Sequence, residues 1–154
     1  MERISEHVSY REGVKSNTAT RLNIKNTPDS YALSNMTGLS IHLFEPLRRW
    51  VGGPIKINSF YRSEDLNKAI GGSSRSQHCQ GRAIDIDDTF GLKTNAEMFY
   101  YIKEKLNFDQ IIWEFGDDKN PDWVHVSYIS TNENRGRALK AYRVKGKTKY
   151  KNYG

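Results

Sequence analysis

The chain has 154 residues, the size of one ordinary domain, and a formal net charge of +6; its 12% aromatic content excludes a disordered chain. Its single cysteine, Cys79, excludes a disulfide framework and any zinc finger with several cysteine ligands, so a metal site has to use histidine and carboxylate side chains. No apolar run approaches the ~18 residues that span a bilayer, and the first ten residues lack the apolar stretch of a signal peptide, so we expect neither feature.

The expected elements place helices first and most strands later in the chain. Two kinds of pattern indicate the helices. One is the capping box, in which glutamate follows serine or threonine after three residues, and the other is the recurrence of apolar residues every three or four positions. The expected helices cover residues 9–16, 29–51 with a kink at Pro46, 64–70 and 94–106. The expected strands cover residues 55–58, 83–86, 110–115, 123–128 and 139–144. This order favours an α+β fold in which helices pack on a small antiparallel sheet.

The most informative segment is a loop followed by a short strand. The loop carries His78, Gly81 allows a tight backbone turn, and Ala83 and Asp85 share one face of the strand. Farther along, His125 stands in a strand whose valines face the core, so the histidine faces the other way. Two histidines and one carboxylate leave a fourth position open, as in catalytic zinc sites, although the spacing also allows another divalent ion.

This segment resembles the Ser-x-His-x-x-Gly-x-Ala-x-Asp signature of the peptidase M15 family of zinc D-Ala-D-Ala carboxypeptidases and phage endolysins, which cut peptidoglycan peptides. All five positions match, and two further elements occur in the expected order. They are Ser59-Phe60-Tyr61-Arg62-Ser63 upstream and Asp122-x-x-His125 downstream. The resemblance covers roughly residues 28–128. It implies the fold shared by D-Ala-D-Ala peptidases and hedgehog domains.

The resemblance also implies a role for each matching polar residue. The implied zinc ligands are His78, Asp85 and His125; the implied general base is Asp122; and Arg62 is the cation that binds the substrate's carboxylate or polarises the scissile carbonyl. Many relatives have glutamate where this chain has Asp122. Glu114, on the neighbouring predicted strand, is the second candidate for the base or for orienting the substrate.

Strand geometry sets a condition on Asp122, because residues three apart on a regular strand point to opposite faces. Asp122 and His125 can face one metal ion only if Asp122 precedes the strand, and the turn at 120–121 makes this feasible. Two alternatives stay open here. In one, Asp122 is only a turn residue before the strand; in the other, Glu114 has a structural role and no part in catalysis.

Plain structural interpretations apply to other residues as well. Arg62 would form an ion pair with Glu64 or Asp65 across the start of a helix. Trp113 and Trp123 are expected in the core rather than as platforms that bind sugars.

The net positive charge comes entirely from the end of the chain. Eight of the 24 Lys and Arg residues follow Glu133, the last acidic residue, which leaves 16 basic and 18 acidic residues before it and a formal charge of −2 there. Four lysines alternate over residues 145–151, so an extended tail would point them to one side, as suits an anionic polymer. A solvated terminus that aids solubility is the plainer interpretation. We expect one domain over residues 1–134, followed by a basic tail over 135–154 with an edge strand and then disorder.

Together with the ligand pattern, the resemblance to the peptidase M15 family implies a zinc-dependent peptidase that hydrolyses an amide bond in peptidoglycan stem peptides or cross-bridges, either as a D-Ala-D-Ala carboxypeptidase or as an endolysin-type endopeptidase. The expected partners are these peptides and, through the basic tail, the anionic cell wall; a monomer is favoured. The acidic body and the lack of a nucleic-acid motif argue against a nucleic-acid partner.

The same patterns fit a phage lysis or virion-associated protein made in the host cytoplasm, or a bacterial enzyme exported by another route. The rival interpretation is a catalytically silent, zinc-stabilised wall-binding module of a phage particle. Asp122 and Arg62 argue against this rival, because a structural zinc site needs neither residue.

Overall fold

The computed structural model describes all 154 residues and has the predicted α+β architecture, built around a six-stranded sheet. The strands are β3 (Lys56–Ser59), β4 (Ala83–Asp87), β5 (Gln110–Glu114), β6 (Trp123–Ser127), β7 (Arg137–Val144) and β8 (Lys147–Asn152). Their order in the sheet is β3-β4-β6-β5-β7-β8. All neighbouring pairs are antiparallel except β5 and β7, which are parallel. An antiparallel sheet was expected, but the sheet contains this one parallel pair, because the segment after β6 returns the chain to the far side of β5.

Short helices surround this sheet, and a small hairpin of β1 (Arg3–Ser5) and β2 (Val8–Ser9) opens the chain. The helices are α1 (Tyr10–Val14), α2 (Asn17–Leu22), α3 (Ser30–Leu39), the π-helix η1 (Ser40–Phe44), α4 (Glu45–Val51), α5 (Glu64–Ala69), the 3-10 helix η2 (Gln77–Gln80) and α6 (Asn95–Lys105). Capping boxes begin α1 at Ser9 and α6 at Thr94, as predicted. The small hairpin and α2 were not predicted, because such short elements show no measurable periodicity. None of the helices combines the length and the apolarity needed to cross a membrane.

The long helix expected after Asp29 is present in three parts, α3, η1 and α4. Asp29 caps it by accepting a hydrogen bond from the Ala32 N–H at 2.8 Å. The expected kink takes the form of the π-helical turn η1 just before Pro46, which has no N–H to donate to the preceding turn. Gly52 ends α4 in the left-handed conformation, with φ 84°.

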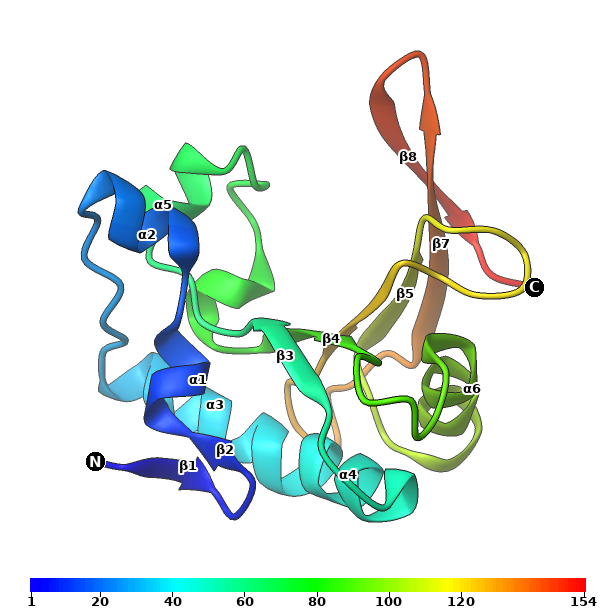
Figure 1. The fold of residues 1–154 in the computed structure, drawn as a ribbon, viewed down its shortest axis with the longest axis horizontal. Helices are drawn as coiled ribbons and strands as arrows, with labels where there is room; N and C mark the ends of the chain where they lie inside the picture. The colour runs from blue at the N-terminus through cyan, green and yellow to red at the C-terminus, as the bar shows by residue number, and fades with distance from the viewer.

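The two faces of the sheet differ in chemistry. One face packs against α3, α4 and α6, and its apolar side chains belong to a cluster of 22 buried residues (Figure 1). Alternate residues of the same strands point to the other face, where Asp85 lies opposite His125 and His125 lies opposite Ile112. The alternation along each strand therefore separates the apolar core from a polar face.

The end of the chain is a hairpin of β7 and β8, where an edge strand followed by disorder was expected. Lys145 and Gly146 connect the strands with φ 50° and 78°, the conformation of a two-residue turn that suits the twist of a hairpin. The hairpin projects away from the helices (Figure 1). On β8, three lysines lie on one face, and Thr148 and Tyr150 lie on the other.

Asp109 ties the start of this hairpin to the turn before β4. Its side chain is fully buried and accepts hydrogen bonds from Gln77 Nε2 at 3.0 Å and from Arg135 Nε and Nη2 at 2.9 and 2.8 Å. Burial alone would raise the pKa of Asp109, but the hydrogen bonds from Arg135 and Gln77 outweigh it and lower the pKa to about 2. One carboxylate thus holds two segments that are distant in the sequence.

Candidate metal centre

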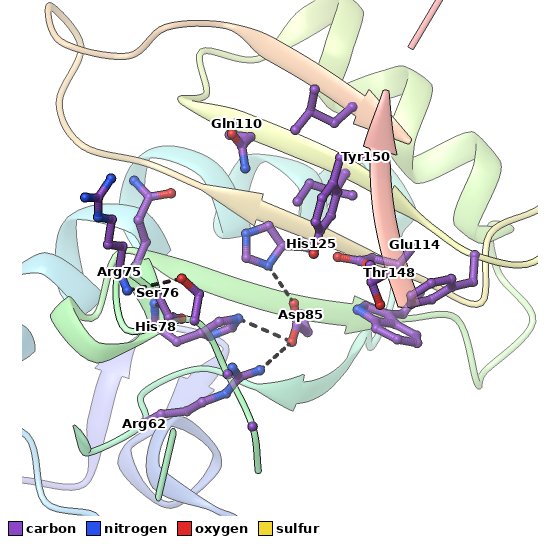
Figure 2. A pocket seen from close by; sticks show the side chains of 18 of the residues that line it. Arg62, Arg75, Ser76, His78, Asp85, Gln110, Glu114, His125, Thr148 and Tyr150 are labelled. Carbon is purple, nitrogen blue, oxygen red and sulfur yellow. Dashed lines mark hydrogen bonds and ion pairs between the residues drawn. The ribbon is translucent and has the colours of Figure 1, made fainter. Parts of the chain in front are cut away.

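A cavity of about 550 Å³ lies on the polar face of the sheet. Strands β4, β5 and β6 form its floor, residues 71–77 form one side, and the C-terminal hairpin forms the other (Figure 2). Five of the six site residues predicted from the sequence line this cavity: Arg62, His78, Asp85, Glu114 and His125. Asp122 does not line it.

His78, Asp85 and His125 converge at the floor of the cavity (Figure 2). Asp85 on β4 lies directly opposite His125 on β6, and its Oδ1 is 3.0 Å from His125 Nδ1. The other carboxylate oxygen, Asp85 Oδ2, is 3.3 Å from His78 Nε2. One nitrogen or oxygen atom from each residue lies within 4.8 Å of the others, a grouping that can hold a metal ion. The structure thus brings together the three residues predicted as ligands.

The turn before β4 orients His78. Ser76 caps η2 by accepting a hydrogen bond from the His78 N–H, and Gly81 ends η2 with φ 71°. A Cβ at Gly81 would collide with the carbonyl oxygen of Ala32 on α3, so this position needs glycine both for its conformation and for close packing. His78 Nδ1 lies 2.7 Å from the carbonyl oxygen of Phe60. Its N–H donates there, which leaves the lone pair of Nε2 directed into the site.

The chemistry of these three side chains fits a divalent metal ion. His78 Nε2 is buried without a hydrogen-bond partner, and a buried lone pair is costly unless a donor or a cation meets it. Burial lowers the pKa of His78, which favours the neutral imidazole that coordination requires. Burial alone would raise the pKa of Asp85, but the neighbouring imidazoles of His78 and His125 hold it below its usual range. Two imidazole nitrogens and one carboxylate oxygen form a donor set typical of zinc.

Arg62 lies beside this centre and contacts its carboxylate. Nη2 donates to Asp85 Oδ2 at 3.2 Å, Nε donates to Ser59 Oγ at 3.0 Å, and Nη1 donates to Asn67 Oδ1 at 3.4 Å. Its ion pair is therefore with Asp85 and not with the acidic residues that begin α5. One N–H on each terminal nitrogen stays free for another acceptor.

Glu114 shares the cavity with the three candidate ligands. It lies on the same face of the sheet as His125, and it is 8% exposed. The pKa of Glu114 is raised to about 7, mainly by burial and in part by the nearby charge of Asp85. His125 and Arg62 lower this pKa, but their effect is smaller. A carboxyl group with a pKa near neutrality can accept a proton and return it in one reaction cycle.

Asp122 lies outside this group. It precedes β6 by one residue, yet its side chain is exposed and lines a neighbouring pocket, which shares Phe115 and Arg143 with the first. Its backbone N–H donates to the Glu114 carbonyl at 2.9 Å, and its carbonyl accepts from Asn95 Nδ2 at 3.1 Å. These bonds hold Asp122 nearly in line with β6, so the alternation along the strand directs its side chain away from the face of His125.

Several cavity residues were not identified from the sequence. Trp113 is buried in the core as expected, but Trp123 lines the cavity. The hairpin adds four more lining residues: Leu139, Arg143, Thr148 and Tyr150. A signal for them was present in the sequence, because alternating residues flank the Lys145-Gly146 turn and define a second face next to the lysines.

A comparison with known protein families matches the region of the chain that carries the candidate site. Residues 6–127 match the family model described as Peptidase M15. No curated protein matches the chain. The matched region includes all six predicted site residues, whereas β7 and β8 lie outside it.

Proposed function

Because the chain belongs to the peptidase M15 family, we propose that it is a zinc-dependent peptidase that hydrolyses an amide bond of peptidoglycan. The convergence of His78, Asp85 and His125 beside Glu114 in one cavity carries this proposal. The matching signature around His78 supports peptidoglycan as the substrate. The reaction is that of a D-Ala-D-Ala carboxypeptidase or of an endopeptidase acting on stem peptides or cross-bridges.

His78, Asp85 and His125 would hold the zinc ion. When bound, zinc polarises an amide carbonyl and lowers the pKa of a water molecule toward about 7. The Phe60 carbonyl fixes the tautomer of His78, and the hydrogen bond from Arg62 orients the Asp85 carboxylate. The free N–H groups of Arg62 would donate to the carbonyl oxygen or to a carboxylate of the substrate.

We assign the general base to Glu114 in preference to Asp122. The ionised Glu114 carboxylate would accept a proton from the attacking water and return it to the leaving amine. Its position in the cavity and its pKa of about 7 support this role, whereas the Asp122 side chain is exposed in a neighbouring pocket.

The test of the proposed function measures new amines released from purified peptidoglycan. Wild-type protein, chelator-treated protein and His125→Ala are compared, and bound metal is quantified in the same samples. We expect cleavage that requires both zinc and His125, and the product masses identify the bond. Stoichiometric zinc without cleavage of any wall type would favour the rival, a zinc-stabilised wall-binding module. A protein that binds no zinc would contradict the ligand assignment.

A matched pair of variants tests the base. Glu114→Gln and Asp122→Asn each neutralise one carboxylate with little change of shape. Loss of a general base lowers kcat by about 10²- to 10⁴-fold, so we expect that loss for Glu114→Gln and a change below about 3-fold for Asp122→Asn. The opposite result would assign the base to Asp122.

The proposal also includes where the enzyme acts. The lysine-bearing face of β8 would hold the enzyme on the anionic wall. This fits a monomeric phage lysis or virion-associated enzyme, or a bacterial enzyme exported by another route.

A further inference from the structure

The C-terminal hairpin lies outside the region that matches the family model, yet it forms one side of the cavity. Its parallel pairing with β5 places Ala141 next to Glu114, and the antiparallel pairing with β8 places Tyr150 next to Ala141. Arg143, two residues beyond Ala141, shares this face and also lines the cavity. The hairpin therefore presents an arginine and a tyrosine toward the proposed metal centre.

Arg143 is oriented by an aromatic ring and has no charged partner. Its guanidinium carbon lies 3.9 Å from the centroid of the Phe115 ring. Phe115 has φ 58°, a left-handed backbone conformation that is rare for a bulky residue and frequent at ligand-binding sites. Unlike Arg62 and Arg135, Arg143 makes no ion pair. Stacking covers one face of the guanidinium and leaves the N–H groups at its edge free to bind an anion.

Tyr150 lines the same side of the cavity as Arg143. It points from β8 toward His125 and Glu114 (Figure 2), and 55% of the residue is exposed. Burial of the hydroxyl and the nearby charges of Glu114 and Asp85 raise the pKa of Tyr150, so the hydroxyl keeps its proton at neutral pH. It can therefore donate a hydrogen bond to a bound ligand.

The positive side chains around the cavity favour a negatively charged ligand, and Arg143 is the one that the hairpin contributes. The acidic lining residues are Asp85 and Glu114, both at the floor beside the proposed metal ion. The sides carry Arg62, Arg75 and Arg143, and a guanidinium group donates hydrogen bonds without accepting any. A planar guanidinium next to a hydroxyl donor matches the two oxygens of a carboxylate.

We propose that Arg143 and Tyr150 form a subsite that binds a carboxylate of the peptide substrate, so that the hairpin selects acidic stem peptides. This subsite rests on the proposed function, because it assumes that a peptide lies across the metal centre. It adds a determinant of specificity from a part of the chain that the family match does not include.

The experiment uses the zinc-loaded full chain and two synthetic probes. One is the stem pentapeptide L-Ala-γ-D-Glu-L-Lys-D-Ala-D-Ala with free carboxylates, and the other is the same peptide with both carboxylates converted to amides. Binding is measured by calorimetry and hydrolysis by amine release, for wild type, Arg143→Gln, Arg143→Lys and Tyr150→Phe. Matched controls are Lys149→Gln and Tyr142→Phe, which change the same hairpin on its other face. Thermal unfolding verifies that each variant is folded.

We expect Arg143→Gln to weaken binding of the free acid by about 10- to 100-fold and binding of the amide by less than about 3-fold, because a charge-assisted hydrogen bond is lost only with the acid. Arg143→Lys, which keeps the charge but not the planar fork, is expected to lie between wild type and Arg143→Gln. Tyr150→Phe is expected to weaken binding of the acid by about 3- to 10-fold, the effect of one neutral hydrogen bond. Neither control should alter the preference for the acid.

Two outcomes would overturn the subsite. One is equal binding of acid and amide by wild type, and the other is an unchanged preference in Arg143→Gln. If wild type prefers the acid through Arg143 but hydrolyses neither peptidoglycan nor peptide, the subsite stands and the proposed function fails. If wild type hydrolyses both peptides without preference, the peptidase stands and the subsite fails.

Discussion

The candidate metal centre and the C-terminal hairpin share one sheet, but they are built in opposite ways. His78 and Asp85 are 2% and 7% exposed, and contacts within the protein orient both side chains. Every residue of β8, in contrast, is exposed. Folding alone therefore positions the candidate ligands, whereas the hairpin leaves charged and aromatic groups exposed and able to contact a partner.

We expect the strongest effect at the buried candidate metal centre. Zinc that binds only the folded state at 1,000 times its dissociation constant should stabilise the wild type by about 4 kcal/mol. In Asp85→Asn we expect this gain to disappear and peptide hydrolysis to fall by more than about 100-fold. Replacing a residue that only hydrogen-bonds to a metal ligand typically lowers activity by about 10- to 100-fold, and the loss of a ligand itself should exceed that. Thermal unfolding with and without zinc measures the gain. Lys149→Gln on the hairpin serves as the control and should keep it; a full zinc response in Asp85→Asn would remove Asp85 from the ligand set.

Asp109 tests the junction between the two regions. Asp109→Asn should lower the free energy of unfolding at pH 7 by about 3 kcal/mol, because the buried side chain loses the charge-assisted hydrogen bonds that Asp109 accepts from Arg135. The pKa of Asp109 is lowered in the folded state, so its contribution is present above about pH 4 and is lost as the pH falls toward 2. Urea unfolding at pH 7 and pH 2.5 should therefore show a large and then a small difference from wild type.

Asp118→Asn is the control for Asp109. Asp118 pairs with Lys140 but is fully exposed to solvent, and an ion pair between exposed side chains contributes little to stability. Equal destabilisation by the two substitutions would show that burial of Asp109 has no special importance.

Glu114 provides a smaller effect of the opposite sign. In the metal-free protein its pKa is raised from 4.5 to about 7, so the folded state holds a proton that the unfolded state has released between these values. The stability from this group is present below about pH 4.5 and is lost as the pH rises through 7. Glu114→Gln cannot ionise, so it should stabilise the metal-free protein by about 2 kcal/mol at pH 8 and have little effect at pH 4. Urea unfolding at these two pH values measures the difference, and stabilisation that is equal at both would contradict the raised pKa.

The smallest expected effect belongs to the exposed face of the hairpin. Replacing Lys147, Lys149 and Lys151 by glutamine should reduce retention on purified cell walls by a few-fold at low salt. The difference should vanish near 1 M salt, where screening acts within about 3 Å, and hydrolysis of a soluble peptide should not change. A control set replaces three exposed lysines outside the hairpin: Lys25, Lys56 and Lys105. Equal loss of retention in both sets would show that net charge, and not this face, determines wall binding.

Sequence patterns predicted the buried half of the site better than the exposed half. The alternation of apolar and polar residues placed Asp85 and His125 on one face, and the glycine at position 81 indicated the turn that carries His78. These features depend on local backbone rules that a sequence expresses directly.

The position of Asp122 could not be predicted in the same way. It depends on where β6 begins and on the hydrogen bond between Asp122 and the Glu114 carbonyl, which is a contact between strands. The parallel pairing of β7 with β5 was also not predictable, because alternation assigns faces but does not choose the neighbouring strand. Arg143 and Tyr150 reach the cavity only through that pairing.

The shared anchor at Asp109 has a consequence for how such an enzyme can evolve. Gln77 belongs to the turn that carries His78, and Arg135 leads into the hairpin, so one carboxylate sets the spacing between the two sides of the cavity. A substitution that widens the cavity for bulkier ligands by releasing either side also removes part of what keeps the protein folded. Cavity width and stability are therefore coupled through this residue, and a variant that widens the cavity is expected to need compensating changes elsewhere.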